Sequence, residues 1–278
     1  MKDHHLLRPM MLALTALVTL GLSGCGTTSA APPRGVPSVP KTRAQPKPKR
    51  TSAKPSPHSS APHAPWPTLV LQSLGLIQGH TAVALMGPAS VPRGNSAKVS
   101  FSASQYTVNV FQCPAADPIN SSAIGHGLCG AMASFAEGFG ATRYPSHAAA
   151  QAALAYQPPS GTPVTMSLPG GLTGSRWRIS GQTGPHNTAT IVWHEGNWTL
   201  VVSGGPPEQS SALLVTHLLQ HYRLPPHTGL LTVDVAGDGL HTSVQWVLGS
   251  TVYFTSAMHN PAHAIIMAAS IEPFDSNS

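Results

Sequence analysis

The sequence predicts an α+β fold, in which an antiparallel sheet is built from repeated β-β-β-α units and the helices pack on one face. Two hairpin patterns predict it, at 188–202 and 242–254, each with a β-branched and aromatic run, a tight turn with glycine and a second such run. A strand pattern precedes each hairpin and a helix pattern follows it. Trp193 and Trp246 occupy matching places in the two hairpins, 53 residues apart.

Each of the two units is predicted to end in a helix. In 208–222, leucines recur at helical spacing, and Pro225 with Pro226 stops the helix. In 261–270, Asn260 is the expected N-cap and Pro261 the first helical residue. The strands expected before the hairpins lie at 175–180 and 230–235. The alternative is that two unrelated hairpins resemble each other by chance.

A looser third copy of the unit is predicted earlier in the chain. Its strands are expected near 81–86, 98–101 and 105–112, and its helix at 146–156. The segment that holds Cys113 and Cys129 would be an insertion before that helix. The folded part is predicted at 68–278, after the proline-rich stretch, as one domain or as subdomains 68–165 and 166–278.

The N-terminus carries the pattern of an export signal. A basic start and a short apolar run lead into Leu22-Ser-Gly-Cys25, and the run is too short for a spanning helix, which needs about 20 apolar residues. This motif resembles the lipobox of bacterial lipoproteins. The resemblance implies a signal peptide at 1–24, cleavage before Cys25 and a diacyl group on its sulfur. The alternative is an ordinary secretory signal with a chance cysteine.

Residues 25–67 are predicted to be a disordered linker behind the lipidated cysteine. They are rich in proline, serine and alanine, and offer little apolar surface to bury. Seven Lys and Arg and no acidic residue lie in this stretch, whereas 68–278 holds six Lys and Arg against eight Asp and Glu. The basic linker suggests attraction to anionic lipid or wall polymer. The alternative is that its charges only keep it soluble, and the export signal argues against nucleic acid as a partner.

The layout of the C-terminal region resembles that of uncharacterised secreted lipoproteins of Gram-positive bacteria. The resemblance rests on the Leu168-Pro-Gly-Gly171 turn, the paired hairpins and the closing helix that ends near Ser270. It implies an extracytoplasmic location and carries over no catalytic residue.

The cysteine count predicts one disulfide. With Cys25 lipidated, Cys113 and Cys129 remain as an even pair in an oxidising compartment. A bridge across a loop of this length contributes about 3 kcal/mol in the chain-entropy model. The alternatives are two buried thiols or a metal pair with His126, although no CxxC spacing indicates a zinc site.

No catalytic motif, metal site or cofactor site is assigned. His217 and His221 have helical spacing but lack the glutamate of H-E-x-x-H, and His259 with His263 straddles a helix start. A solvated helix face is the favoured interpretation of such pairs. Four carboxylates are open to a glycosidase role, although nothing in the sequence brings any two together: Glu137, Glu195, Glu208 and Asp234.

The tryptophans leave two interpretations open. Trp193, Trp198 and Trp246 either cover the core between sheet and helices, which is favoured, or form an exposed platform for sugar rings or an apolar ligand.

The predicted function is a lipid-anchored protein on the extracytoplasmic face of the cell membrane, with a stalked binding or scaffolding domain and no enzymatic role. The alternatives are a hydrolase of wall polymer and a carrier of an apolar ligand.

Overall fold

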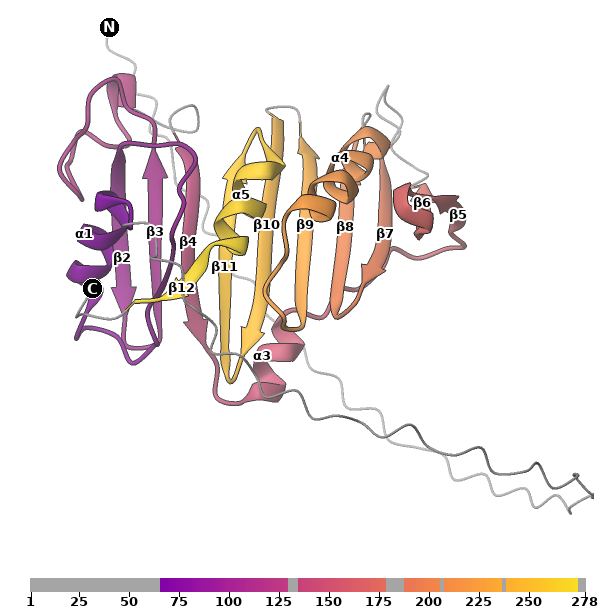
Figure 1. Cartoon of the computed structure of the whole chain (residues 1–278), viewed down its shortest axis with the longest axis horizontal. Helices are drawn as coiled ribbons and strands as arrows, with labels where there is room; N and C mark the ends of the chain where they lie inside the picture. Colours follow the sequence, from indigo (N-terminus) through magenta and orange to yellow (C-terminus); the bar gives the residue numbers. More distant parts are fainter. Residues whose placement is uncertain (1–65, 130–134, 179–187, 206–207, 237–238, 275–278) are drawn as a thin grey trace, which may run out of the picture. The chain divides into compact units, whose positions relative to one another are not determined.

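The computed structural model describes residues 66–129, 135–178, 188–205, 208–236 and 239–274 (Figure 1). All of them belong to one compact unit. The predicted signal peptide, Cys25 and the linker up to residue 65 lie outside the described residues. Among the described helices, none is long and apolar enough to cross a bilayer.

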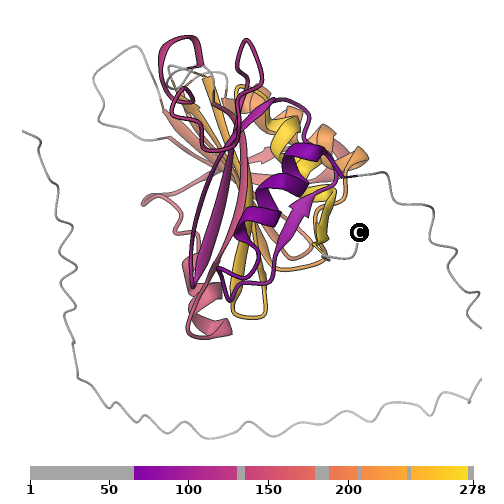
Figure 2. The ribbon, with the colours of Figure 1, turned by 90° about the vertical axis from the view of Figure 1, so that its left-hand side faces the viewer.

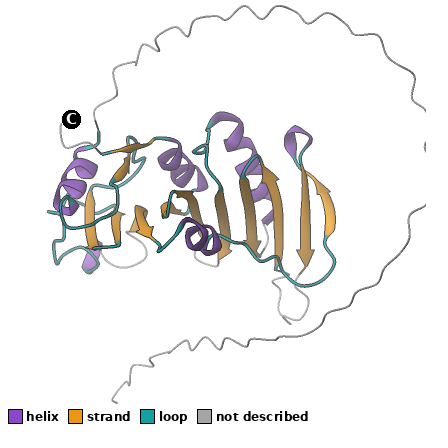
Figure 3. Cartoon of the chain, turned by 90° about the horizontal axis from the view of Figure 1, so that it is seen from below, coloured by secondary structure: helices purple, strands orange, loops and turns teal. Residues whose placement is uncertain are grey.

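A ten-stranded, mostly antiparallel sheet forms the body of the fold, and Figure 3 shows its strands following one another across the domain. Its strands are β2 (Ser96–Ser102), β3 (Gln105–Phe111), β4 (Phe135–Arg143), β5 (Val164–Ser167), β6 (Thr173–Arg178), β7 (Ala189–Glu195), β8 (Trp198–Gly204), β9 (Gly229–Ala236), β10 (Gly239–Leu248) and β11 (Thr251–Met258). Their spatial order is β2-β3-β4-β11-β10-β9-β8-β7-β6-β5. Only the β8–β9 pair is parallel. The two halves 68–165 and 166–278 therefore share one sheet, through β4 and β11.

Three helices cover one face of this sheet (Figure 2): α1 (Thr68–Ile77), α4 (Glu208–His221) and α5 (Pro261–Ala269). Their apolar side chains join every second residue of the strands in one core. Trp193 and Trp246 are among its largest fully buried side chains. The prediction of a mixed fold with a large antiparallel sheet is confirmed in this form.

The fourth helix, α3 (His147–Ala153), lies on the other side of the sheet. Ala150 and Leu154 pack with Val247 and Val252, whose side chains point away from the main core. The prediction that all helices share one face is therefore wrong for α3. The reason is local: β10 and β11 carry valines on both faces near their turn, and those on the second face need a cover.

The first predicted strand, at 81–86, does not enter the large sheet. Instead β1 (Met86–Pro88) pairs with β12 (Ile271–Pro273) in a separate two-stranded sheet. The strand that completes β2 and β3 is β4, which the sequence did not predict because Gly138 and Gly140 weaken the strand pattern. Gly140 is needed there, since a Cβ would collide with the backbone carbonyl oxygen of Tyr106 on β3 and lie 2.8 Å from the ring of Phe254 on β11.

The two predicted hairpins are β7–β8 and β10–β11. Each has a two-residue turn that starts with glycine in the left-handed region, Gly196 at φ 58° and Gly249 at φ 61°. Trp193 and Trp246 each lie two residues before the end of the first strand. The element order is β6-β7-β8-α4 in one segment and β9-β10-β11-α5 in the next.

Candidate functional site

The face of the sheet opposite α1, α4 and α5, called the open face here, is covered in part by α3 and by the segment that follows it. Strand residues alternate between the core and this face. Small polar side chains are common on it, among them Ser100, Thr107, Asn109, Thr232 and Ser243, next to the buried valines Val192, Val201, Val247 and Val252. An antiparallel sheet with one polar face tolerates water there, so the open face is stable when bare and can also accept a polar ligand.

A hollow of about 490 Å³ lies on the open face over β9, β10 and β11. Asp234 on β9 lies directly opposite His241 on β10. On its other side, Asp234 lies opposite Ser203 on β8. The Ser203 hydroxyl donates to Asp234 Oδ1 at 3.4 Å. The acid thus stands between serine and histidine. A serine nucleophile needs histidine in the middle, so this row offers hydrogen bonds and one negative charge rather than a catalytic triad.

A second hollow, of about 250 Å³, lies on the same face over β6, β7 and β8. The segment between α3 and β5 runs over it and contributes Tyr156, while Trp177 and His194 come from the strands. The Trp177 indole N–H donates to the Gly161 carbonyl at 3.3 Å, and Thr199 Oγ1 lies 3.3 Å from His194 Nδ1. The sequence prediction did not include these residues. Their signal was the alternation within 173–178 and 189–195, which places Trp177 and His194 opposite the core.

The helix-covered face holds a buried acid beside a histidine. Glu137 on β4 is fully buried, and His263 Nδ1 on α5 lies 2.9 Å from its Oε1. Neither carboxylate oxygen accepts a well-formed hydrogen bond from the described residues. Burial raises the pKa of Glu137 to about 7, against the lowering effect of the backbone and charge of Arg93. Burial and the same arginine lower the pKa of His263.

The other candidate carboxylates have separate partners. Glu208 at the start of α4 forms an ion pair with Arg176 on β6. Glu195 accepts a hydrogen bond from the Trp193 indole N–H at 2.8 Å. Asp234 lies on the open face, opposite to Glu137, so the described structure does not bring these acids together as the pair that glycoside hydrolysis requires.

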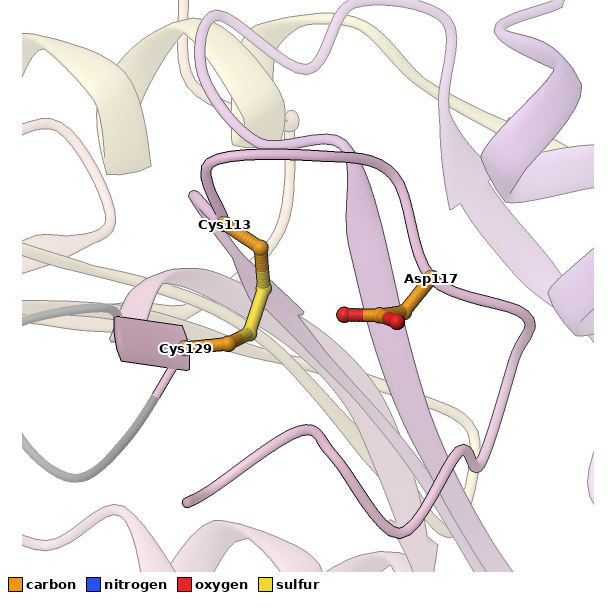
Figure 4. Close-up of side chains that lie close together, drawn as sticks. All are labelled: Cys113, Asp117 and Cys129. Carbon is orange, nitrogen blue, oxygen red and sulfur yellow. A yellow bond between two sulfur atoms is a disulfide. The ribbon is translucent and has the colours of Figure 1, made fainter. Parts of the chain in front are cut away.

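Cys113 and Cys129 lie at disulfide-bonding distance, with a Cα–Cα separation of 4.7 Å (Figure 4). Asp117 lies beside them, and its carboxylate and the two sulfurs are within 4.8 Å of one another. Metal ions bind thiolates, and the sulfurs here are joined to each other. The arrangement is therefore a bridge with a neighbouring carboxylate, and His126 is not part of it.

The predicted histidine pairs behave differently from each other. His217 and His221 are exposed on α4, with ring centroids 4.9 Å apart in an edge-to-face contact. Among the described residues, no third ligand joins them in a metal-binding group. His259 is exposed, with φ at 68°, while His263 reaches the buried Glu137.

The tryptophans Trp193, Trp198 and Trp246 belong to the core, with 1%, 6% and 0% exposure. The platform interpretation is wrong for these three, because alternation turns them toward α4 and α5. On that side, the segment 223–227 separates two hollows of about 290 and 430 Å³. Trp198 donates its indole N–H to Pro225 O at 3.1 Å and so holds this segment to the sheet.

Searches against protein-family models, curated proteins and solved structures found no match to this chain. The geometry of the chain is therefore the basis for any functional assignment.

Proposed function

We propose that the chain is a lipid-anchored protein of the cell envelope, whose domain binds wall polymer with the open face of its sheet. Cys25 would carry the lipid, and the basic linker would lift the domain from the extracytoplasmic face of the membrane, near anionic lipid or polymer. The observation that carries the binding role is the open face, which is broad, uncovered by α1, α4 or α5, and rich in hydroxyl groups.

The chemistry of this face favours a polar polymer. Thr232, Ser243 and Ser256 line the 490 Å³ hollow and can donate and accept hydrogen bonds at its rim, while most of the lining surface is apolar. Shallow, multiple hydrogen-bonding positions along a flat sheet suit an extended ligand with many hydroxyls. The arrangement also weighs against the hydrolase alternative, because Asp234 and Glu137 occupy opposite faces.

The alternative of an apolar-ligand carrier has one supporting observation. The 430 Å³ hollow beside α5 is lined by Met86, Leu224, Trp246 and Ile271. Such a lining fits an apolar ligand of modest size. The space between the sheet and the helices is otherwise filled by buried side chains, so we rank this function second.

We also infer that β6-β7-β8-α4 and β9-β10-β11-α5 are copies of one unit. The supporting facts are the shared element order, the glycine turns at Gly196 and Gly249, and the buried Trp193 and Trp246.

The test of the binding role is site-specific photo-crosslinking in cells that make the full chain. A crosslinker at Ser243, on the open face, is expected to attach wall polymer. The matched control is a crosslinker at Leu214, an exposed residue of α4 on the helix side, and it is expected to attach none. Equal capture from both positions, or capture only from Leu214, would overturn the assignment to the open face. Loss of binding of a fatty-acid probe, after Met86 is replaced by a bulkier residue, would favour the carrier function instead.

A further inference from the structure

The geometry points to a subsite for one neutral sugar ring in the 250 Å³ hollow around Trp177. This inference rests on the proposed binding of wall polymer and names the chemical unit that the open face would recognise. The hollow lies under the segment that joins α3 to β5, at the end of the open face farthest from the disulfide.

The aromatic lining supplies the apolar part of such a site. Trp177 and Tyr156 both line the hollow, Trp177 from β6 and Tyr156 from the segment after α3. Both are partly buried, and burial raises the pKa of the Tyr156 hydroxyl above its ordinary value of 10.0. The hydrogen bond from Trp177 to Gly161 fixes the indole orientation. A ring held in this way presents a rigid face to the C–H side of a pyranose.

The polar side chains of the lining supply hydrogen-bonding groups for the hydroxyls of a sugar. Thr173, Ser175 and Thr199 bring hydroxyls, and His194 brings a ring nitrogen. A purely apolar ligand would displace the water bound to these groups and leave their hydrogen bonds unmade, which would lower its affinity. A sugar ring, with an apolar face and a rim of hydroxyls, satisfies both parts of the lining.

Charge and size narrow the ligand class further. None of the side chains that line this hollow in the described structure is Asp, Glu, Lys or Arg. An acidic or basic sugar would therefore lose hydration without gaining a counter-ion. The volume is slightly below the range of about 300–1,000 Å³ typical of sites for drug-sized ligands, which suits a single ring of a longer chain.

The test uses the full mature protein in detergent and the N-acetylglucosamine tetramer as a neutral probe, with heparin as an acidic comparison. Titration calorimetry is expected to show binding of the tetramer and at least tenfold weaker binding for Trp177→Ala. Trp177→Phe keeps an aromatic face and should retain most of the affinity. Thr199→Val should weaken binding several-fold, whereas Ser210→Ala, at an exposed position of α4 on the helix-covered side, should leave it unchanged.

Three outcomes would overturn the subsite: no binding of the tetramer, unchanged affinity in a folded Trp177→Ala variant, or tighter binding of heparin than of the tetramer. Melting curves of each variant separate loss of the site from loss of the fold. Failure of the subsite is distinguishable from failure of the wider function. Polymer captured at Ser243 with no effect of Trp177→Ala refutes the subsite alone. Tetramer binding that depends on Trp177 without any capture at Ser243 refutes the broader assignment.

Discussion

At the scale of single residues, Glu137 makes the stability of the domain depend on pH. Its carboxyl is fully buried and its pKa is raised from 4.5 to about 7, so the folded state holds the proton more tightly than the unfolded chain. The stability contributed by this proton is complete below about pH 4.5 and is lost as the pH rises through 7. His263 acts in the opposite direction, because its lowered pKa removes stability as the pH falls below its ordinary value of 6.5.

We therefore expect Glu137→Gln to have little effect on the free energy of unfolding at pH 5 and to stabilise the domain at pH 8. The shift from 4.5 to about 7 corresponds to a difference on the order of 3 kcal/mol between the two conditions. Chemical denaturation at both pH values measures it. A His263→Gln variant is the control for the opposing titration. An equal effect of Glu137→Gln at pH 5 and pH 8 would contradict the argument.

At the scale of secondary structure elements, the two hairpin turns each depend on one glycine. Gly196 and Gly249 adopt positive φ, and no atom lies within 4 Å of a Cβ built on either. Gly196→Val and Gly249→Val should therefore act through backbone strain alone, at about 1–2 kcal/mol each. Thermal unfolding is the measurement, with Asn197→Ala and Ser250→Ala as neighbouring controls. Destabilisation by the controls as large as by the valines would refute the turn assignment.

The loop that the disulfide closes gives a second prediction at this scale. Cys113→Ala and Cys129→Ala should each lower the melting temperature, with a stability loss of about 3 kcal/mol. The double variant should lose little more than either single one, because all three remove the same bridge. A reducing agent should lower the melting temperature of the wild type and leave the double variant unchanged. Free thiols found by alkylation of the denatured, unreduced protein would exclude the bridge.

Sequence patterns predicted the elements whose signals are local. The helix expected at 208–222 is Glu208–His221, and the one at 261–270 is Pro261–Ala269. Helix α1 was not predicted, because Pro67 stands at its N-cap position without a side-chain hydrogen bond. Strand β4 was not predicted because its glycines weaken the strand pattern. The atoms that exclude a side chain at Gly140 belong to Tyr106 and Phe254, which lie elsewhere in the sequence.

The candidate site was less predictable than the elements. The open face joins side chains from the ten strands of the large sheet, and the order of those strands decides which side chains become neighbours. Asp234 and His241 are close in sequence and could have been paired from the hairpin register. Trp177 and Tyr156 meet only because the chain after α3 crosses to the far edge of the sheet, which no local pattern indicates.

At the scale of the whole molecule, the proposed membrane attachment depends on one thiol, that of Cys25. We expect Cys25→Ser to release the protein from membranes or to leave an unprocessed precursor, because the lipid would have no sulfur to join. Cell fractionation and intact mass measure both results. Cys113→Ser is the matched control and should remain in the membrane fraction. A mature wild-type mass without a diacylglycerol group would refute the anchor.

The place of β11 in the strand order has a consequence for how the chain is made. This late strand lies between β4 and β10 and joins the two groups of strands that precede it in the sequence. While synthesis proceeds from the N-terminus, β2–β4 and β5–β8 have no hydrogen bonds to each other, and each group has an open edge. The sheet closes only when the last strands have emerged. Premature termination would leave one chain with two unjoined groups of strands, open to aggregation and proteolysis.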